Sequence, residues 1–111
     1  MQNDEQKSFS KDSLRPLVIR SLRRSNVRKK IAEYLYDINP SGSYTSEIAY
    51  HVKTTPTNVI GAIRGMNSRY RPDESLINLN IVELIQSETN SDIKLYRLTD
   101  FGKEIIESIK T

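Results

Sequence analysis

The segment Thr54 to Tyr70, TTPTNVIGAIRGMNSRY, most constrains the fold, because its two sides differ in character when it is drawn as a helix. At about 100° per residue, one side is apolar and carries Val59, Ile60, Ile63 and Met66. The opposite side is small, polar and basic and carries Thr57, Gly61, Arg64 and Ser68. Thr55 is suited to cap this helix, and Pro56 is suited to its first position. We therefore expect a helix over residues 56–70 with one buried and one exposed side.

A shorter helix is expected just before it, from Thr45 to about Val52, with Thr45 as its cap. Three residues, Lys53 to Thr55, separate the two helices, which predicts a helix-turn-helix. In that motif the second helix enters the major groove of DNA. A small, polar and basic side allows close approach to base edges and phosphates. The sequence thus predicts a DNA-reading helix.

The remaining pattern adds a first helix from Ser25 to Ile38 and two β-type runs, Ile81 to Gln86 and Ile93 to Leu98. Asn80 is expected in the left-handed conformation before the first run, and Thr99 is expected to cap a last helix. The apolar side of that helix consists of Phe101, Ile105, Ile106 and Ile109. This order predicts an α+β fold of the winged helix-turn-helix class, with a three-helix core, a β-hairpin wing and a C-terminal helix.

The division of the chain follows from the same pattern. Residues 1–13 are polar and are expected to form a disordered tail. Residues 14–24 contain the apolar, β-branched run PLVIRSL and are expected to form an N-terminal strand or arm. Residues 25–111 are expected to form the winged-helix domain.

Basic residues cluster near the front of the chain, although the net charge of the 111 residues is only +3. Between Arg15 and Lys30 there are seven arginines and lysines and no acid. Such a cluster fits phosphate binding, and the alternative is a solvated or protein-binding surface.

Composition excludes several other classes of function. The chain has no cysteine and one histidine, His51, so neither a disulfide framework nor a cofactor or metal site is expected. It has no glycine-rich phosphate loop and no nucleophile with an identifiable base, so an enzyme is not expected. It has no apolar run long enough to span a membrane and no secretory signal, so a cytoplasmic location is expected.

Two runs carry a family resemblance: NVIGAIRGM within the predicted reading helix, and YRLTDFG from Tyr96 to Gly102 at the end of the wing. With the flanking sequence from Ser25 to Ile109, the chain resembles the archaeal predicted winged-helix transcriptional regulators, a group that includes the activator of archaellum gene transcription. The resemblance implies sequence-specific DNA binding near promoters. It also implies recognition roles for Thr57, Asn58, Arg64 and Asn67.

The residues expected to contact DNA come from four parts of the chain. They are Arg23, Arg24, Arg28 and Lys29 of the basic cluster; Thr45 and Ser46 of the shorter helix; Thr57, Asn58, Gly61, Arg64, Asn67, Ser68, Arg69 and Arg71 in and after the reading helix; and Lys94 of the wing. Alternatives stay open at this stage. Arg64 could instead cover apolar neighbours with its stem, and Gly65 could serve either DNA approach or helix packing.

Double-stranded DNA in promoter regions is the expected partner, bound by a homodimer whose two reading helices reach half-sites about one helical turn apart. The expected dimer surfaces are the Pro16 to Leu22 segment and the last helix. Contact with the transcription machinery is a further expectation. The rival hypothesis is a winged-helix protein-interaction module in a transcription or replication assembly, in which the basic cluster meets an acidic partner.

Overall fold

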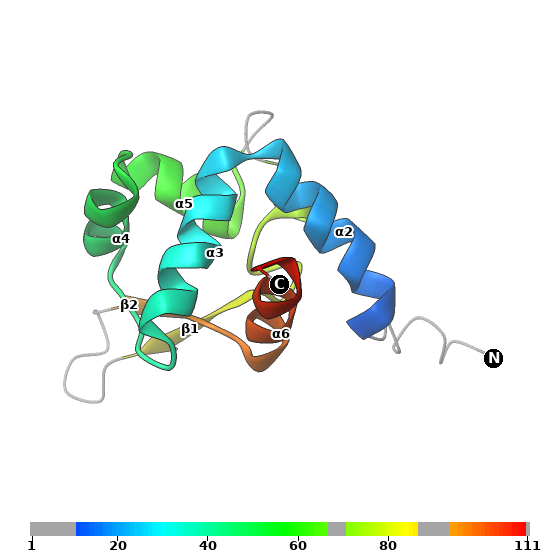
Figure 1. The fold of residues 1–111 in the computed structure, drawn as a ribbon. Helices are drawn as coiled ribbons and strands as arrows, with labels where there is room; N and C mark the ends of the chain where they lie inside the picture. Colours follow the sequence, from blue (N-terminus) through cyan, green and yellow to red (C-terminus); the bar gives the residue numbers. More distant parts are fainter. Residues whose placement is uncertain (1–10, 67–70, 87–93, 111) are drawn as a thin grey trace.

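The computed structural model describes residues 11–66, 71–86 and 94–110. In chain order the elements are helices α2 (Lys11–Arg24), α3 (Asn26–Ile38), α4 (Thr45–Val52) and α5 (Pro56–Arg64), the 3-10 turn η1 (Pro72–Glu74), strands β1 (Val82–Gln86) and β2 (Lys94–Leu98), and helix α6 (Asp100–Lys110). Helix α3 is central and packs against α2, α4, α5, α6 and β2. In Figure 1, α4 and α2 lie on opposite sides of α3.

Helix α3 begins where the sequence predicts. The hydroxyl of Ser25 accepts a hydrogen bond from the Arg28 backbone amide at 3.2 Å and so caps the helix. One face of α3 is buried, and its Ile31 and Leu35 side chains have no exposed surface. This face forms the centre of a core to which every helix and both strands contribute.

The two strands form an antiparallel hairpin in which Val82 pairs with Leu98 and Gln86 pairs with Lys94. Ser43, before α4, adds a bridge to this hairpin through two backbone hydrogen bonds with Tyr96, at 2.9 and 3.0 Å. The order of helices and strands confirms the predicted α+β winged helix-turn-helix fold. The wing tip, residues 87–93, lies outside the described residues.

Residues 14–24 form most of α2, so the predicted strand or arm is wrong. Val18, Ser21 and Leu22 are buried at helical spacing, which shows that packing against the rest of the core decides the conformation. A short apolar run does not by itself distinguish a strand from a buried helix. Of the predicted disordered tail, residues 1–10 lie outside the described residues, whereas 11–13 begin α2.

Helix α5 ends at Arg64 rather than at Tyr70, so its predicted length is wrong. The next residue, Gly65, has φ of 86°, a conformation that side chains other than glycine rarely adopt. A Cβ at Gly65 would lie 2.5 Å from the Cα of Pro72, so this glycine serves packing of the returning chain. Backbone amides of that chain close the helix end, Leu76 to the Ala62 carbonyl at 3.1 Å and Ile77 to the Ile63 carbonyl at 3.0 Å.

Helix α6 is capped as predicted, because the Thr99 hydroxyl accepts a hydrogen bond from the Gly102 amide at 2.8 Å. Phe101, Ile105 and Ile106 are buried against the core. Ile109 is predicted on the same buried side, but it is 45% exposed, in the last turn of α6, where it lines an open groove between α2, α3 and α6. Asn80 takes the predicted left-handed conformation, with φ of 62°.

Candidate nucleic-acid interface

The turn between α4 and α5 is fixed by its own side chains. Lys53 ends α4 in the left-handed conformation, with φ of 61°. The Thr55 hydroxyl then caps α5 by accepting from the Asn58 amide at 3.1 Å, as predicted. The Asn58 side chain donates to the Thr54 hydroxyl at 2.9 Å, so this half-buried amide stiffens the turn. The orientation of α5 relative to α4 is therefore fixed by hydrogen bonds within the protein.

The start of α4 differs from the prediction in its capping residue. Tyr44 precedes the helix, and its backbone amide donates to the Glu47 carboxylate at 3.1 Å. The Ser43 hydroxyl donates to the same carboxylate oxygen at 3.1 Å. Thr45 is thus the first helical residue rather than the cap, and it is half-buried, whereas Ser46 is exposed.

The exposed face of α5 is formed by Pro56, Thr57, Ile60 and Arg64. Thr57 and Arg64 are exposed as predicted, which excludes a buried Arg64. Two predictions about this helix are wrong, because Gly61 is buried and Ile60 is 41% exposed. Helical spacing indicates that Ile60 is exposed. It lies three residues after Thr57 and four before Arg64 and therefore shares their side of the helix.

The sequence predicts a DNA contact for Arg28, but this residue is 3% exposed and pairs with Glu74 inside the protein. Its Nη1 lies 3.3 Å from a Glu74 carboxylate oxygen and 3.4 Å from the Ser21 carbonyl oxygen. The Ser21 hydroxyl donates to the Glu74 carbonyl at 2.7 Å. The Arg28 guanidinium therefore ties α2 and α3 to η1, the turn that follows α5, and its predicted DNA contact is ruled out by burial.

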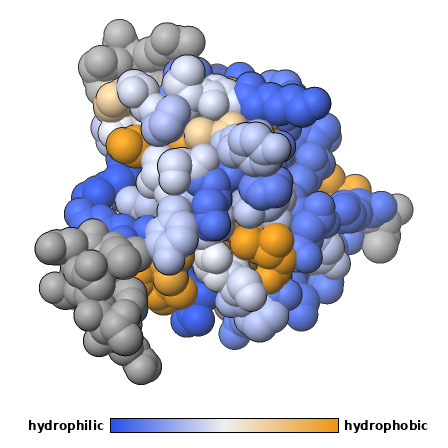
Figure 2. Space-filling view, turned by 90° about the vertical axis from the view of Figure 1, so that its left-hand side faces the viewer, coloured by the Kyte–Doolittle hydropathy of each residue, from blue (hydrophilic) through white to orange (hydrophobic). Residues whose placement is uncertain are grey.

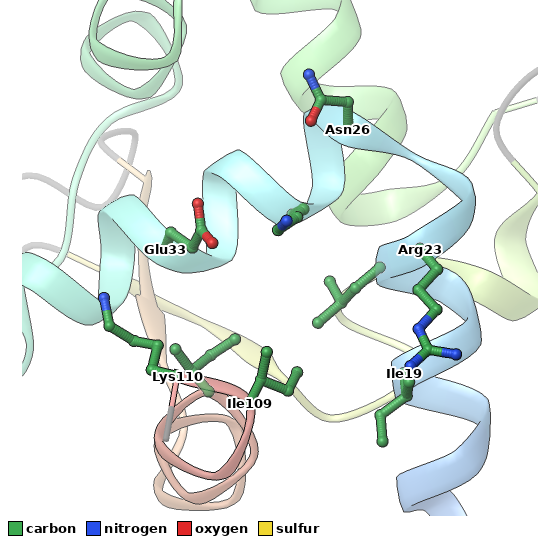
Figure 3. Close-up of a pocket in the computed structure, with 9 residues that line it drawn as sticks. Ile19, Arg23, Asn26, Glu33, Ile109 and Lys110 are labelled. Carbon is green, nitrogen blue, oxygen red and sulfur yellow. The ribbon is translucent and has the colours of Figure 1, made fainter.

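The exposed basic residues that were predicted to contact DNA differ in what they contact within the protein. Arg24 pairs with Glu74 at 2.8 Å while its side chain stays 52% exposed. Arg23 and Lys29 line a groove of about 470 Å³ between α2, α3 and α6. Figure 3 shows Ile19 and Arg23 on one side of this groove and Ile109 and Lys110 on the other. Arg23 and Arg24 also line one hollow of α2 together with Arg15 and Arg20, so the arginines of α2 stay together, and Arg28 is the member of the cluster that burial removes.

Of the remaining residues predicted to contact DNA, two belong to the described part of the chain and three do not. Arg71 is exposed and forms a solvent-facing ion pair with Asp73 at 3.4 Å. Lys94 is exposed at the first position of β2. Asn67, Ser68 and Arg69 lie outside the described residues. The predicted residues that are exposed are Arg23, Arg24, Lys29, Ser46, Thr57, Arg64, Arg71 and Lys94.

Figure 2 shows the face that lies on the left in Figure 1, the side of α4. Hydrophilic residues cover most of this face, and apolar residues form separate small patches. Among the described residues, no group of three or more histidines or carboxylates is arranged to hold a metal ion. None of the described helices has both the length and the apolar character needed to span a bilayer.

A three-helix core with a helix-turn-helix, followed by a two-stranded wing, defines a winged-helix protein. The chain belongs to the EarA-like family, whose model matches residues 18–109. An uncharacterized protein of Methanocaldococcus jannaschii, MJ0905, is 46% identical over 95 residues, covering 86% of this chain and 83% of its own.

Solved structures share the fold at low identity. A chain of the Staphylococcus aureus MepR-DNA complex matches with a TM-score of 0.63 and 16% identity, over 89% of this chain and 74% of MepR. The Lactococcus lactis ZitR C30AH42A mutant matches with a TM-score of 0.60 and 14% identity, over 78% of this chain. The present chain spans about half the length of the ZitR chains, 50% in that case.

Proposed function

We propose that this chain is a sequence-specific, double-stranded DNA-binding transcriptional regulator that inserts α5 into the major groove. The observation that carries the proposal is the exposed face of α5, on which Thr57 and Arg64 point outward from a helix held rigidly by its turn. Arginine and threonine reach base edges and phosphates in such a groove. The proposal is supported by the shared fold with MepR, whose structure was solved in complex with DNA.

Phosphate contacts are proposed for the exposed residues that flank α5. Ser46 lies in the first turn of α4, where backbone amides and the helix dipole favour an anion. Arg71 follows α5, and Lys94 begins β2 at the end of the hairpin next to the wing tip. These contacts would position the protein on the duplex, whereas Arg64 and Thr57 would supply the sequence preference.

We place two further expectations within this proposal. The first is a homodimer, which is supported by the groove that brings the two expected surfaces, α2 and α6, together around apolar side chains. The second is membership in the group that includes the archaellum activator, supported by the archaeal relative MJ0905. We further propose that the protein acts at promoters in the cytoplasm and contacts the transcription machinery. No enzymatic activity is part of this proposal.

The test is selection of preferred sites from random duplex DNA, followed by binding measurements over a salt series. We expect one enriched motif, with two-fold symmetry if the protein binds as a dimer. The affinity should fall with salt, with a log–log slope of about −0.9 per phosphate contact. An affinity that depends on neither sequence nor salt would defeat the proposal. A partner captured after nuclease treatment, with no enriched motif, would favour the protein-interaction module instead.

A further inference from the structure

We propose that Ile60 is a specificity residue that recognises the 5-methyl group of a thymine in the major groove. The inference rests on the proposed function of α5 and adds to it the base that one side chain would read. The starting observation is that the Ile60 side chain, predicted to be buried, is 41% exposed. It lies on the face of α5 that carries Thr57 and Arg64.

Core packing does not account for an isoleucine at this position. The other aliphatic residues of α5, Val59, Ala62 and Ile63, have no exposed surface. Isoleucine is also a poorer helix former than alanine, leucine, lysine or glutamate, because its branched Cβ loses freedom against the preceding turn. A single exposed apolar residue is ordinary on a protein surface, so its place on the helix decides what it can contact.

That place is the middle of the outward face. Ile60 lies one turn before Arg64 and one turn after Pro56, with Thr57 beside it. The thymine methyl is the apolar group that base edges present in the major groove. Cβ atoms one turn apart are about 5–6 Å from each other, and base pairs are about 3.4 Å apart. The thymine should therefore lie within about two base pairs of the nucleotide that Arg64 contacts.

The charge around Ile60 favours DNA over an apolar protein partner as the occupant. The whole of α5, PTNVIGAIR, contains no acid and ends on an exposed arginine. The α5 face therefore combines an apolar side chain with a hydroxyl and a guanidinium group. The major groove presents matching groups, namely thymine methyl groups, hydrogen-bonding base edges and phosphates.

The experiment uses the full chain and the duplex motif obtained by site selection. Each thymine of the motif is replaced in turn by deoxyuridine, which removes the 5-methyl group and leaves the hydrogen-bonding edge unchanged. We expect Kd to rise about four-fold at one position per half-site, which corresponds to about 0.8 kcal/mol for one buried methyl-sized group. At the remaining thymines, Kd should change little.

The same series is repeated with Ile60→Ala and with Leu84→Ala, a matched change at a 39% exposed aliphatic residue of β1 that lies outside the proposed dimer surfaces. Ile60→Ala should abolish the penalty for deoxyuridine at that position, and Leu84→Ala should keep it. Because alanine is the better helix former, Ile60→Ala is expected to fold, and circular dichroism verifies this.

Three results would overturn the inference. If deoxyuridine has no effect at any thymine, or if the penalty is the same in Ile60→Ala, the protein still binds its motif and only the role of Ile60 fails. If no duplex motif is enriched at all, the proposed function fails together with the inference.

Discussion

Replacing the Glu74 carboxylate by an amide tests whether a buried ion pair stabilises the segment that follows α5. Glu74 has a side chain only 10% exposed, and its carboxylate faces Arg28 and Arg24 at 3.3 and 2.8 Å. In Glu74→Gln the shape is kept, but the Arg28 guanidinium, 4% exposed, no longer faces the Glu74 charge. Removing one charge of a buried ion pair is strongly unfavourable.

The expected loss can be assigned mainly to one of the two pairs. Removing one partner of a buried pair costs about 3–5 kcal/mol, and the 3.3 Å separation from Arg28 favours the lower end of that range. The pair with Arg24 adds little, because its side chain is 52% exposed and solvent screens it. We therefore expect the free energy of unfolding to fall by about 3 kcal/mol. At about 4 °C per kcal/mol for a domain of this size, Tm should fall by roughly 12 °C.

The assay is urea unfolding followed by circular dichroism, with Glu83→Gln as the control. Glu83 pairs with Arg97 at 2.8 Å across the hairpin, but both side chains are at least 40% exposed. Loss of such a surface pair changes stability by less than about 1 kcal/mol. Equal and small losses for the two variants would refute the argument that burial makes the Glu74 cluster important.

Three further changes test α5 and the DNA contact proposed for it. Arg64→Ala should weaken binding to the selected motif by about 1–3 kcal/mol in a binding titration, and an equal loss on unrelated duplexes would make Arg64 a phosphate contact. Gly65→Ala should lower the free energy of unfolding by about 1–3 kcal/mol, since its φ is 86° and its Cβ would lie 2.5 Å from Pro72. Thr55→Ala should lower it by about 0.5–2 kcal/mol through loss of the cap, and unchanged urea midpoints would contradict either expectation.

Sequence reasoning succeeded where the signal was local. The cap at Thr55, the left-handed Asn80 and the cap at Thr99 each depend on residues within three positions, and all three are as predicted. The two β-type runs also pair as an antiparallel hairpin, as predicted. Each of these elements is specified by a few neighbouring residues, so the fold class that they define can be predicted from the sequence.

The predictions are wrong where residues distant in the sequence determine the burial of a side chain or the conformation of a segment. Arg28 is buried by Glu74, a residue 46 positions away, so nothing near Arg28 in the sequence marks it as a core residue. The run at Pro16 to Leu22 became a helix because it packs on α3 and on η1. Ile60 is a different case, because its spacing from Thr57 and Arg64 indicates the exposed side, whereas its apolar side chain predicts burial.

The way α5 is held has a consequence for how new DNA preferences could arise. Its last turn is bound by the backbone amides of Leu76 and Ile77, and none of these hydrogen bonds uses a side chain from its exposed face. Thr57, Ile60 and Arg64 can therefore be exchanged while the helix keeps its orientation. One scaffold could in this way acquire many binding specificities through substitutions at a few outward positions, without any need to refold.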